Sequence, residues 1–162
     1  MRLLLAASAA LVVSASAAAA PPRAGLVIPG KSFGGLTLGA TRGQVRAAWG
    51  PRFGVCRGCR EQTWYFNYRA FEPQGAGVSF RARRAVALFT LGSPKGWRTD
   101  RGLRIGDSAV RIAGLYGPLL QIHCGTYSAF TIRRGSTTTA FYVVDERVWA
   151  FGLSRPKAPV CR

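Results

Sequence analysis

Histidine and carboxylates are scarce in this sequence. Its 162 residues include one histidine, His123, and 6 Asp and Glu against 23 Lys and Arg, which gives a formal net charge of +17. The acids form no carboxylate-pair motif, and no P-loop, G-x-S-x-G, H-E-x-x-H or EF-hand spacing occurs. A histidine that activates a nucleophile must be held by a third group, and the neighbouring Cys124 is expected to be oxidised. We therefore expect no catalytic residues, no cofactor and no metal, and a protein that is not an enzyme.

Long apolar runs are absent beyond the N-terminal region, so no membrane span is expected. Arg2 precedes an apolar run over residues 3–13, and the tripeptide at 15–17 fits an A-x-A cleavage site. This pattern predicts a signal peptide over residues 1–17, with cleavage as far as residue 20 as the alternative. No cysteine lies near the cleavage region, which argues against a lipid anchor. The predicted location is secreted, either extracellular or in the cell envelope.

Cysteine is also rare, and its count is even: Cys56, Cys59, Cys124 and Cys161. In an exported protein four cysteines indicate two disulfides, for which three pairings exist. We favour Cys56–Cys59 as a small loop and Cys124–Cys161 as a clasp on the C-terminus. A zinc site at C-R-G-C is the sharper alternative, but the sequence lacks the second C-x-x-C that such sites use.

An internal repeat is the most informative feature that is present. Residues 35–51 and 102–118 align without gaps at an offset of 67 residues, and both end in an aromatic residue followed by Gly-Pro. In each copy a turn glycine precedes an expected helix cap, Thr41 or Ser108, and a short helical pattern follows. Strand patterns come next, at 63–68, 78–81 and 85–91 in the first copy and at 127–132, 138–144 and 148–153 in the second.

These patterns predict an α+β fold of two tandem units, each a short helical segment packed on a three- to four-stranded antiparallel sheet. The expected organisation is an N-terminal segment at 18–30, repeat unit 1 at 31–94 and repeat unit 2 at 95–162. A fourth strand would come from residues 26–28 or from the region of Leu103. The two units are expected to lie edge to edge, so that one broad sheet face stays free.

The repeated order of turn glycine, capped helix, aromatic-Gly-Pro, W-x-F strand and V-x-x-F strand resembles the BamE (SmpA/OmlA) lipoprotein family. In its tandem form it is similar to the β-lactamase inhibitory protein family. The resemblance covers nearly all of residues 31–156. It implies two helix-plus-sheet units side by side and a concave sheet surface used for protein contact.

Basic and aromatic residues fall together on the predicted strands. The candidate binding residues are Tyr65, Arg69, Arg81, Arg83, Arg133, Tyr142 and Trp149. The strand at 148–153 is apolar at successive positions, which indicates one face packed on helices and a second, exposed apolar face typical of a partner site. The sequence thus favours a secreted protein-binding module for an extracellular or envelope protein, such as an inhibitor of an extracellular enzyme.

Two alternatives stay open on these residues. The excess of arginine suits a basic module that binds anionic envelope polymers or nucleic acid, because cationic and aromatic side chains on one sheet face bind phosphates and bases. A small hydrolase or redox protein would instead need His123 or a free Cys124 in a pocket.

Overall fold

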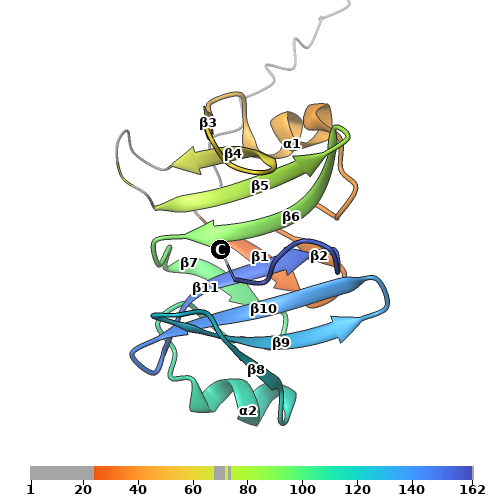
Figure 1. The fold of residues 1–162 in the computed structure, drawn as a ribbon. Helices are drawn as coiled ribbons and strands as arrows, with labels where there is room; N and C mark the ends of the chain where they lie inside the picture. Colours follow the sequence, from red (N-terminus) through yellow and green to blue (C-terminus); the bar gives the residue numbers. More distant parts are fainter. Residues whose placement is uncertain (1–23, 68–71, 73, 162) are drawn as a thin grey trace, which may run out of the picture.

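The computed structural model describes residues 24–67, 72 and 74–161, which form a mostly β protein with two short helices (Figure 1). The elements in chain order are β1 (Ala24–Ile28), β2 (Ser32–Phe33), α1 (Arg42–Trp49), β3 (Gly54–Val55), β4 (Gln62–Asn67), β5 (Gly75–Arg81), β6 (Arg84–Leu91), β7 (Gly96–Thr99), α2 (Val110–Tyr116), β8 (Leu120–His123), β9 (Ser128–Arg134), β10 (Thr137–Val144) and β11 (Arg147–Ser154). The predicted signal peptide, residues 1–17, lies outside the described residues. Neither helix in the described ranges combines the length and the apolar composition that a membrane crossing requires.

One antiparallel sheet, here called the main sheet, contains eight strands in the order β3-β4-β5-β6-β11-β10-β9-β8. Strands β3 to β6, which follow α1, form one half of it, and strands β8 to β11, which follow α2, form the other. The two halves meet where β6 pairs with β11, with Leu88 opposite Leu153. Figure 1 shows the yellow and green strands above this junction and the blue strands below it.

The predicted fold class, an α+β protein of two helix-on-sheet units, is wrong. The chain forms one continuous eight-stranded sheet, and its helices are only eight and seven residues long. Two separate sheets would each end in a long apolar strand with unpaired backbone groups at its edge. Pairing of Ala87–Phe89 in β6 with Gly152–Ser154 in β11 satisfies part of these groups and joins the small sheets expected from the repeat into one.

A second sheet has the strand order β2-β1-β7, in which β1 pairs parallel with β7 and antiparallel with β2. The expectation that residues 26–28 or the Leu103 region add an edge strand to the main sheet is therefore wrong. Trp97 of β7 is fully buried, and its ring lies 4.8 Å from that of Phe33. These residues belong to the same apolar cluster as Val45 of α1 and Ile112 of α2. The second sheet and both helices thus pack on one face of the main sheet, and we call the other side the open face.

The two helices begin differently. At α1 the Thr41 hydroxyl accepts a hydrogen bond from the Gln44 backbone N–H at 3.2 Å, and the Gln44 side chain accepts one from the Thr41 N–H at 2.8 Å. This capping box confirms the expected start of the first helix. The expected cap at Ser108 is wrong, because α2 starts at Val110 and its N-cap residue, Ala109, makes no side-chain bond.

Two β-bulges decide which side chains reach the open face. The register between β10 and β11 shifts so that Trp149 has no partner across the ladder, and the shift between β5 and β6 does the same for Val86. Strict alternation would put Trp149 and Ala150 on opposite faces. With the bulge, Val148 and Phe151 lie in the main core while Trp149 and Ala150 both pack on the open face. This is why the strand is apolar at successive positions.

Candidate functional site

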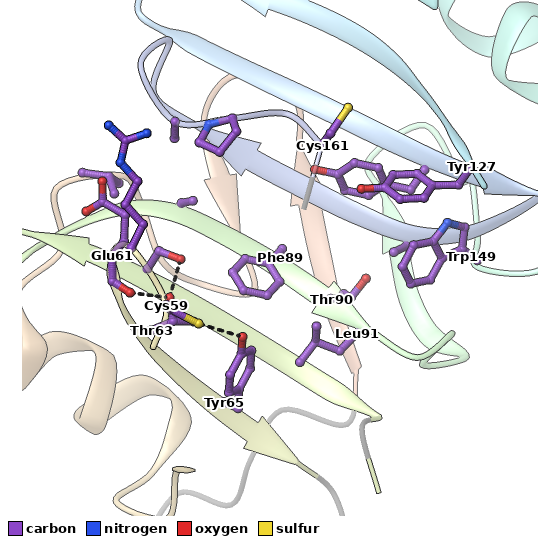
Figure 2. A pocket seen from close by; sticks show the side chains of 18 residues that line it. Cys59, Glu61, Thr63, Tyr65, Phe89, Thr90, Leu91, Tyr127, Trp149 and Cys161 are labelled. Carbon is purple, nitrogen blue, oxygen red and sulfur yellow. Dashed lines mark hydrogen bonds between the residues drawn. The ribbon is translucent and has the colours of Figure 1, made fainter. Parts of the chain in front are cut away.

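A groove of about 510 Å³ lies on the open face, across the junction of β6 and β11 (Figure 2). We call it the aromatic groove. It is lined by Cys59, Arg60, Glu61, Thr63, Tyr65, Ser79, Val86, Ala87, Phe89, Thr90, Leu91, Tyr127, Tyr142, Trp149, Ala150, Ala158, Pro159 and Cys161. The volume falls in the range of about 300–1,000 Å³ that ligand sites typically have.

Aromatic rings from both halves of the sheet form the sides of the groove. The ring centroids of Tyr65 and Phe89, on β4 and β6, lie 6.3 Å apart. In the other half, Trp149 packs on Tyr127 at 5.8 Å and on Tyr142 at 6.1 Å. Figure 2 shows Tyr65 and Phe89 on the green strands and Tyr127 and Trp149 against the blue ones. Rigid aromatic side chains supply contact area at a low entropy cost, so they suit a binding surface.

Two glycines make room for the rings. A Cβ atom on Gly77 of β5 would lie 2.5 Å from the ring of Phe89, and one on Gly152 of β11 would lie 2.9 Å from the hydroxyl of Tyr142. Each ring therefore lies directly over the glycine of a neighbouring strand, and the side chain of any larger residue there would collide with the ring. Because of these glycines, the rings of Phe89 and Tyr142 lie close to the sheet backbone on the open face.

The two disulfides bound the groove on different sides. The structure contains both bonds of the favoured pairing, Cys56–Cys59 and Cys124–Cys161, and no cysteine is free. Cys59 and Cys161 both line the groove, and the Tyr65 hydroxyl lies 3.7 Å from the Cys59 Sγ.

After β11, residues 155–161, here called the C-terminal strap, cross the open face to reach Cys124. The Arg155 N–H donates to the Val86 carbonyl at 2.9 Å, and the Tyr142 hydroxyl donates to the Val160 carbonyl at 2.7 Å. Ala158 of the strap is buried and lines the groove together with Pro159. The strap is thus a fixed wall of the groove.

The carboxylate of the groove is already paired. Glu61 accepts hydrogen bonds from Arg81 Nε at 3.0 Å and from Arg81 Nη2 at 2.5 Å. This hydrogen bond is the main reason that the pKa of the Arg81 guanidinium is raised above its usual value. Nearby, the hydroxyls of Thr63 and Ser79 lie 2.9 Å apart and bond to each other. Glu61, Thr63 and Ser79 therefore all have hydrogen-bond partners within the protein.

The structure brings together the aromatic members of the predicted set and separates the arginines. Tyr65, Tyr142 and Trp149 line the groove, whereas Arg81 lies beside it as the partner of Glu61. Arg83 occupies the β5–β6 turn with a φ of 63°, and Arg133 is exposed on β9. Neither of these two arginines lines the groove. Arg69 lies outside the described residues.

Sequence reasoning missed Phe89, Tyr127, Glu61 and the C-terminal strap as groove residues. Phe89 carried a signal, because Ala87, Phe89 and Leu91 alternate along a strand whose opposite face holds Leu88. The strap carried none beyond Cys161, since its course over the sheet follows from tertiary contacts.

The histidine of the sequence lies outside the groove. His123 ends the edge strand β8, is exposed, and has its Nδ1 at 3.4 Å from the Ser128 hydroxyl. It is not among the groove residues. Within the described ranges, no three His, Cys, Asp or Glu side chains gather in a way that could hold a metal ion. The groove therefore contains no histidine among its lining residues.

Comparison with known proteins gives a likeness of fold. Neither protein-family models nor curated sequences match this chain. An extracellular protein containing a SCP domain from Bacillus anthracis str. Ames is similar with a TM-score of 0.54 and 10% identity over 74% of this chain, which spans 44% of that protein's length. A DUF4309 family protein (YjgB) from Bacillus subtilis subsp. subtilis str. 168 is similar with a TM-score of 0.54 and 21% identity, over 75% of this chain and 82% of that one.

Neither structure is a member of the BamE or β-lactamase inhibitory protein families, and the resemblance of the sequence to those families stays a prediction.

Proposed function

We propose that this chain is an exported, non-enzymatic binding protein that docks onto a partner protein through the aromatic groove. The groove itself carries the proposal. It combines a cavity of about 510 Å³, aromatic walls from both halves of the sheet and two disulfides that fix its boundaries. Partially exposed aromatic residues around an apolar floor are the usual composition of interface hot spots.

Export is supported by two observations. Disulfides persist in oxidising compartments, and all four cysteines of this chain are in disulfides. One structural neighbour is described as an extracellular protein. An inhibitor of an extracellular enzyme is a form of this function that the groove suits, because a preformed and rigid surface binds without an ordering cost.

Capture of a partner from culture medium and envelope extract, with purified protein held by an N-terminal tag, tests the proposal. Trp149→Ala removes one aromatic wall, and Leu91→Glu places a carboxylate in the groove without removing a ring. Arg133→Ala, on exposed β9 away from the groove, is the matched control. We expect one protein to be retained by the wild type and by Arg133→Ala, and lost by both groove variants. Equal retention by all four proteins would contradict the proposal.

A second candidate function has its own observation. Arg42, Arg83 and Arg84 line a separate hollow of about 500 Å³ beside the β5–β6 turn. Three guanidinium groups around one hollow suit an anionic polymer. Affinity for such a polymer should fall log-linearly with salt and should drop in Arg83→Ala, while the groove variants keep it.

A further inference from the structure

We infer that the segment seated in the aromatic groove is acidic: an exposed protein stretch that inserts one large apolar side chain between the aromatic walls and places Asp or Glu against the rim. This inference rests on the proposed function and specifies the chemistry of its partner. It follows from how the polar groups of the groove are used and from the sign of the charge around it.

The hydroxyl groups on the floor are already satisfied from within the protein, and Trp149 Nε1 in the wall, which has no hydrogen-bond partner, is buried. The Thr63 hydroxyl bonds to Ser79 at 2.9 Å and donates to the Glu61 carbonyl at 3.0 Å. The Thr90 hydroxyl accepts from the Phe151 N–H at 2.9 Å, and the Tyr142 hydroxyl donates to the strap. A polar ligand would lose its water hydrogen bonds here without new partners. The floor therefore selects an apolar side chain.

The charge around the groove is positive. Among the 18 lining residues the one carboxylate is Glu61, and Arg81 neutralises it at 2.5 Å. Arg60 lines the same end and is exposed, and Lys157 is exposed in the C-terminal strap beside Ala158. Arg60 thus lines the groove, and Lys157 is a further cation in the strap that forms its wall, on a chain whose formal net charge is +17. Such a field attracts an acidic partner and repels a basic one.

An acidic polymer without apolar groups would use only part of this surface. It could approach the cations at the rim, but it would leave the aromatic walls hydrated. The shape of the site is accounted for only when an apolar anchor and flanking acids are combined in one segment. A partner of this kind is an exposed protein loop or chain end.

Tryptophan fluorescence offers a direct readout of the groove. The chain has four tryptophans, and Trp49, Trp64 and Trp97 are buried with 1%, 5% and 0% exposure. Trp149 is partly exposed and lines the groove. Changes in emission or in acrylamide quenching on binding therefore report Trp149. The variant Trp149→Phe removes this reporter and shows whether a signal comes from the groove.

Four synthetic pentapeptides, titrated into the full protein, separate the two requirements. They are Glu-Asp-Phe-Asp-Glu, its amide counterpart Gln-Asn-Phe-Asn-Gln, the basic Lys-Arg-Phe-Arg-Lys, and the anchorless Glu-Asp-Gly-Asp-Glu, all with blocked ends. We expect the first to bind at least tenfold more tightly than the basic and the anchorless peptides, and several-fold more tightly than the amide peptide. Arg60→Gln should weaken the first peptide about threefold at low salt, and Arg133→Gln should leave it unchanged.

Each other result overturns the inference in an identifiable way. Equal binding of the acidic, amide and basic peptides refutes the charge preference, although a groove signal from Trp149 would still support a docking site. Equal binding of the anchorless peptide shows that the surface takes polyanions and needs no apolar side chain. No binding of any peptide at millimolar concentration refutes recognition of a short acidic segment, and the capture experiment then decides separately whether a folded partner uses the groove.

Discussion

Replacing Cys124 and Cys161 by serine cuts the covalent tie that holds the C-terminal strap over the open face. The bond links positions 37 residues apart, so it restricts a long loop of the unfolded chain. The loop-entropy relation gives a stabilisation of about 4 kcal/mol for this separation. For Cys56–Cys59, with a separation of 3, the same relation gives about 1.5 kcal/mol.

The two double variants therefore form a matched pair in which each loses one disulfide. Urea unfolding, followed by circular dichroism and by tryptophan fluorescence, should show a loss of free energy more than twice as large for Cys124→Ser/Cys161→Ser as for Cys56→Ser/Cys59→Ser. A domain of this size has about 5–15 kcal/mol of stability, so the first variant should remain folded at room temperature but melt well below the wild type.

The comparison can fail in a clear way. If both variants lose the same free energy, or if the variant of the long loop loses less than about 2 kcal/mol, the strap is not the constraint that the structure indicates. The denaturant slope must be compared as well, because removal of the bond also expands the unfolded state.

Three further predictions concern local features and can be checked by urea unfolding. Thr41→Ala should lower the free energy of unfolding by about 1 kcal/mol because it removes the capping box of α1. Ser108→Ala should lower it little because Ser108 does not cap α2. Equal losses in the two variants would refute the assignment of the caps. Arg83 and Glu146 have φ of 63° and 60° in two-residue hairpin turns, a left-handed conformation that costs energy for residues other than glycine. Arg83→Gly and Glu146→Gly should therefore each raise the free energy of unfolding by up to about 1 kcal/mol. A loss of stability in both variants would contradict the turn geometry. Burial raises the pKa of Tyr116 above the ordinary tyrosine value of 10, so the folded state favours the neutral phenol. The stability that this contributes is fully present below pH 10 and is lost as the pH rises through the folded pKa. As the pH rises above 10, the wild type should therefore lose stability more steeply than Tyr116→Phe.

The strands of the main sheet were predictable because their signals are local. The runs at 63–68 and 138–144 alternate or concentrate β-branched and aromatic residues, and they correspond to β4 and β10. The pairing of β1 with β7 joins residues about 70 positions apart, with Val27 opposite Thr99. No sequence pattern within β1 or β7 predicts which strand it pairs with, so this part of the fold depends on tertiary packing around Trp97.

Three aromatic residues of the groove, Tyr65, Tyr142 and Trp149, were among the predicted binding residues, but Phe89, Tyr127 and the outline of the groove were not predicted. Tyr65 follows from strand alternation, whereas Trp149 reaches the open face only through a bulge. A bulge depends on the registers of two strands, which a single sequence does not reveal. The predicted arginines Arg83 and Arg133 lie away from the groove for a different reason. Arg83 and Arg133 are close to aromatic residues in sequence, but turn geometry and strand position keep them away from the groove.

The groove crosses the junction of β6 and β11, so a bound partner would affect how the two halves of the main sheet move. Only the stretch from Ala87 to Phe89 is paired with residues of β11, and the cavity spans this narrow joint with rings rooted on both sides of it. A partner bound in the groove would contact residues from both halves of the main sheet and would restrict their motion relative to each other. Backbone amide protons in both halves of the main sheet should then exchange more slowly when the partner is bound. Binding would thus stabilise strands that lie far from the groove as well as those that line it.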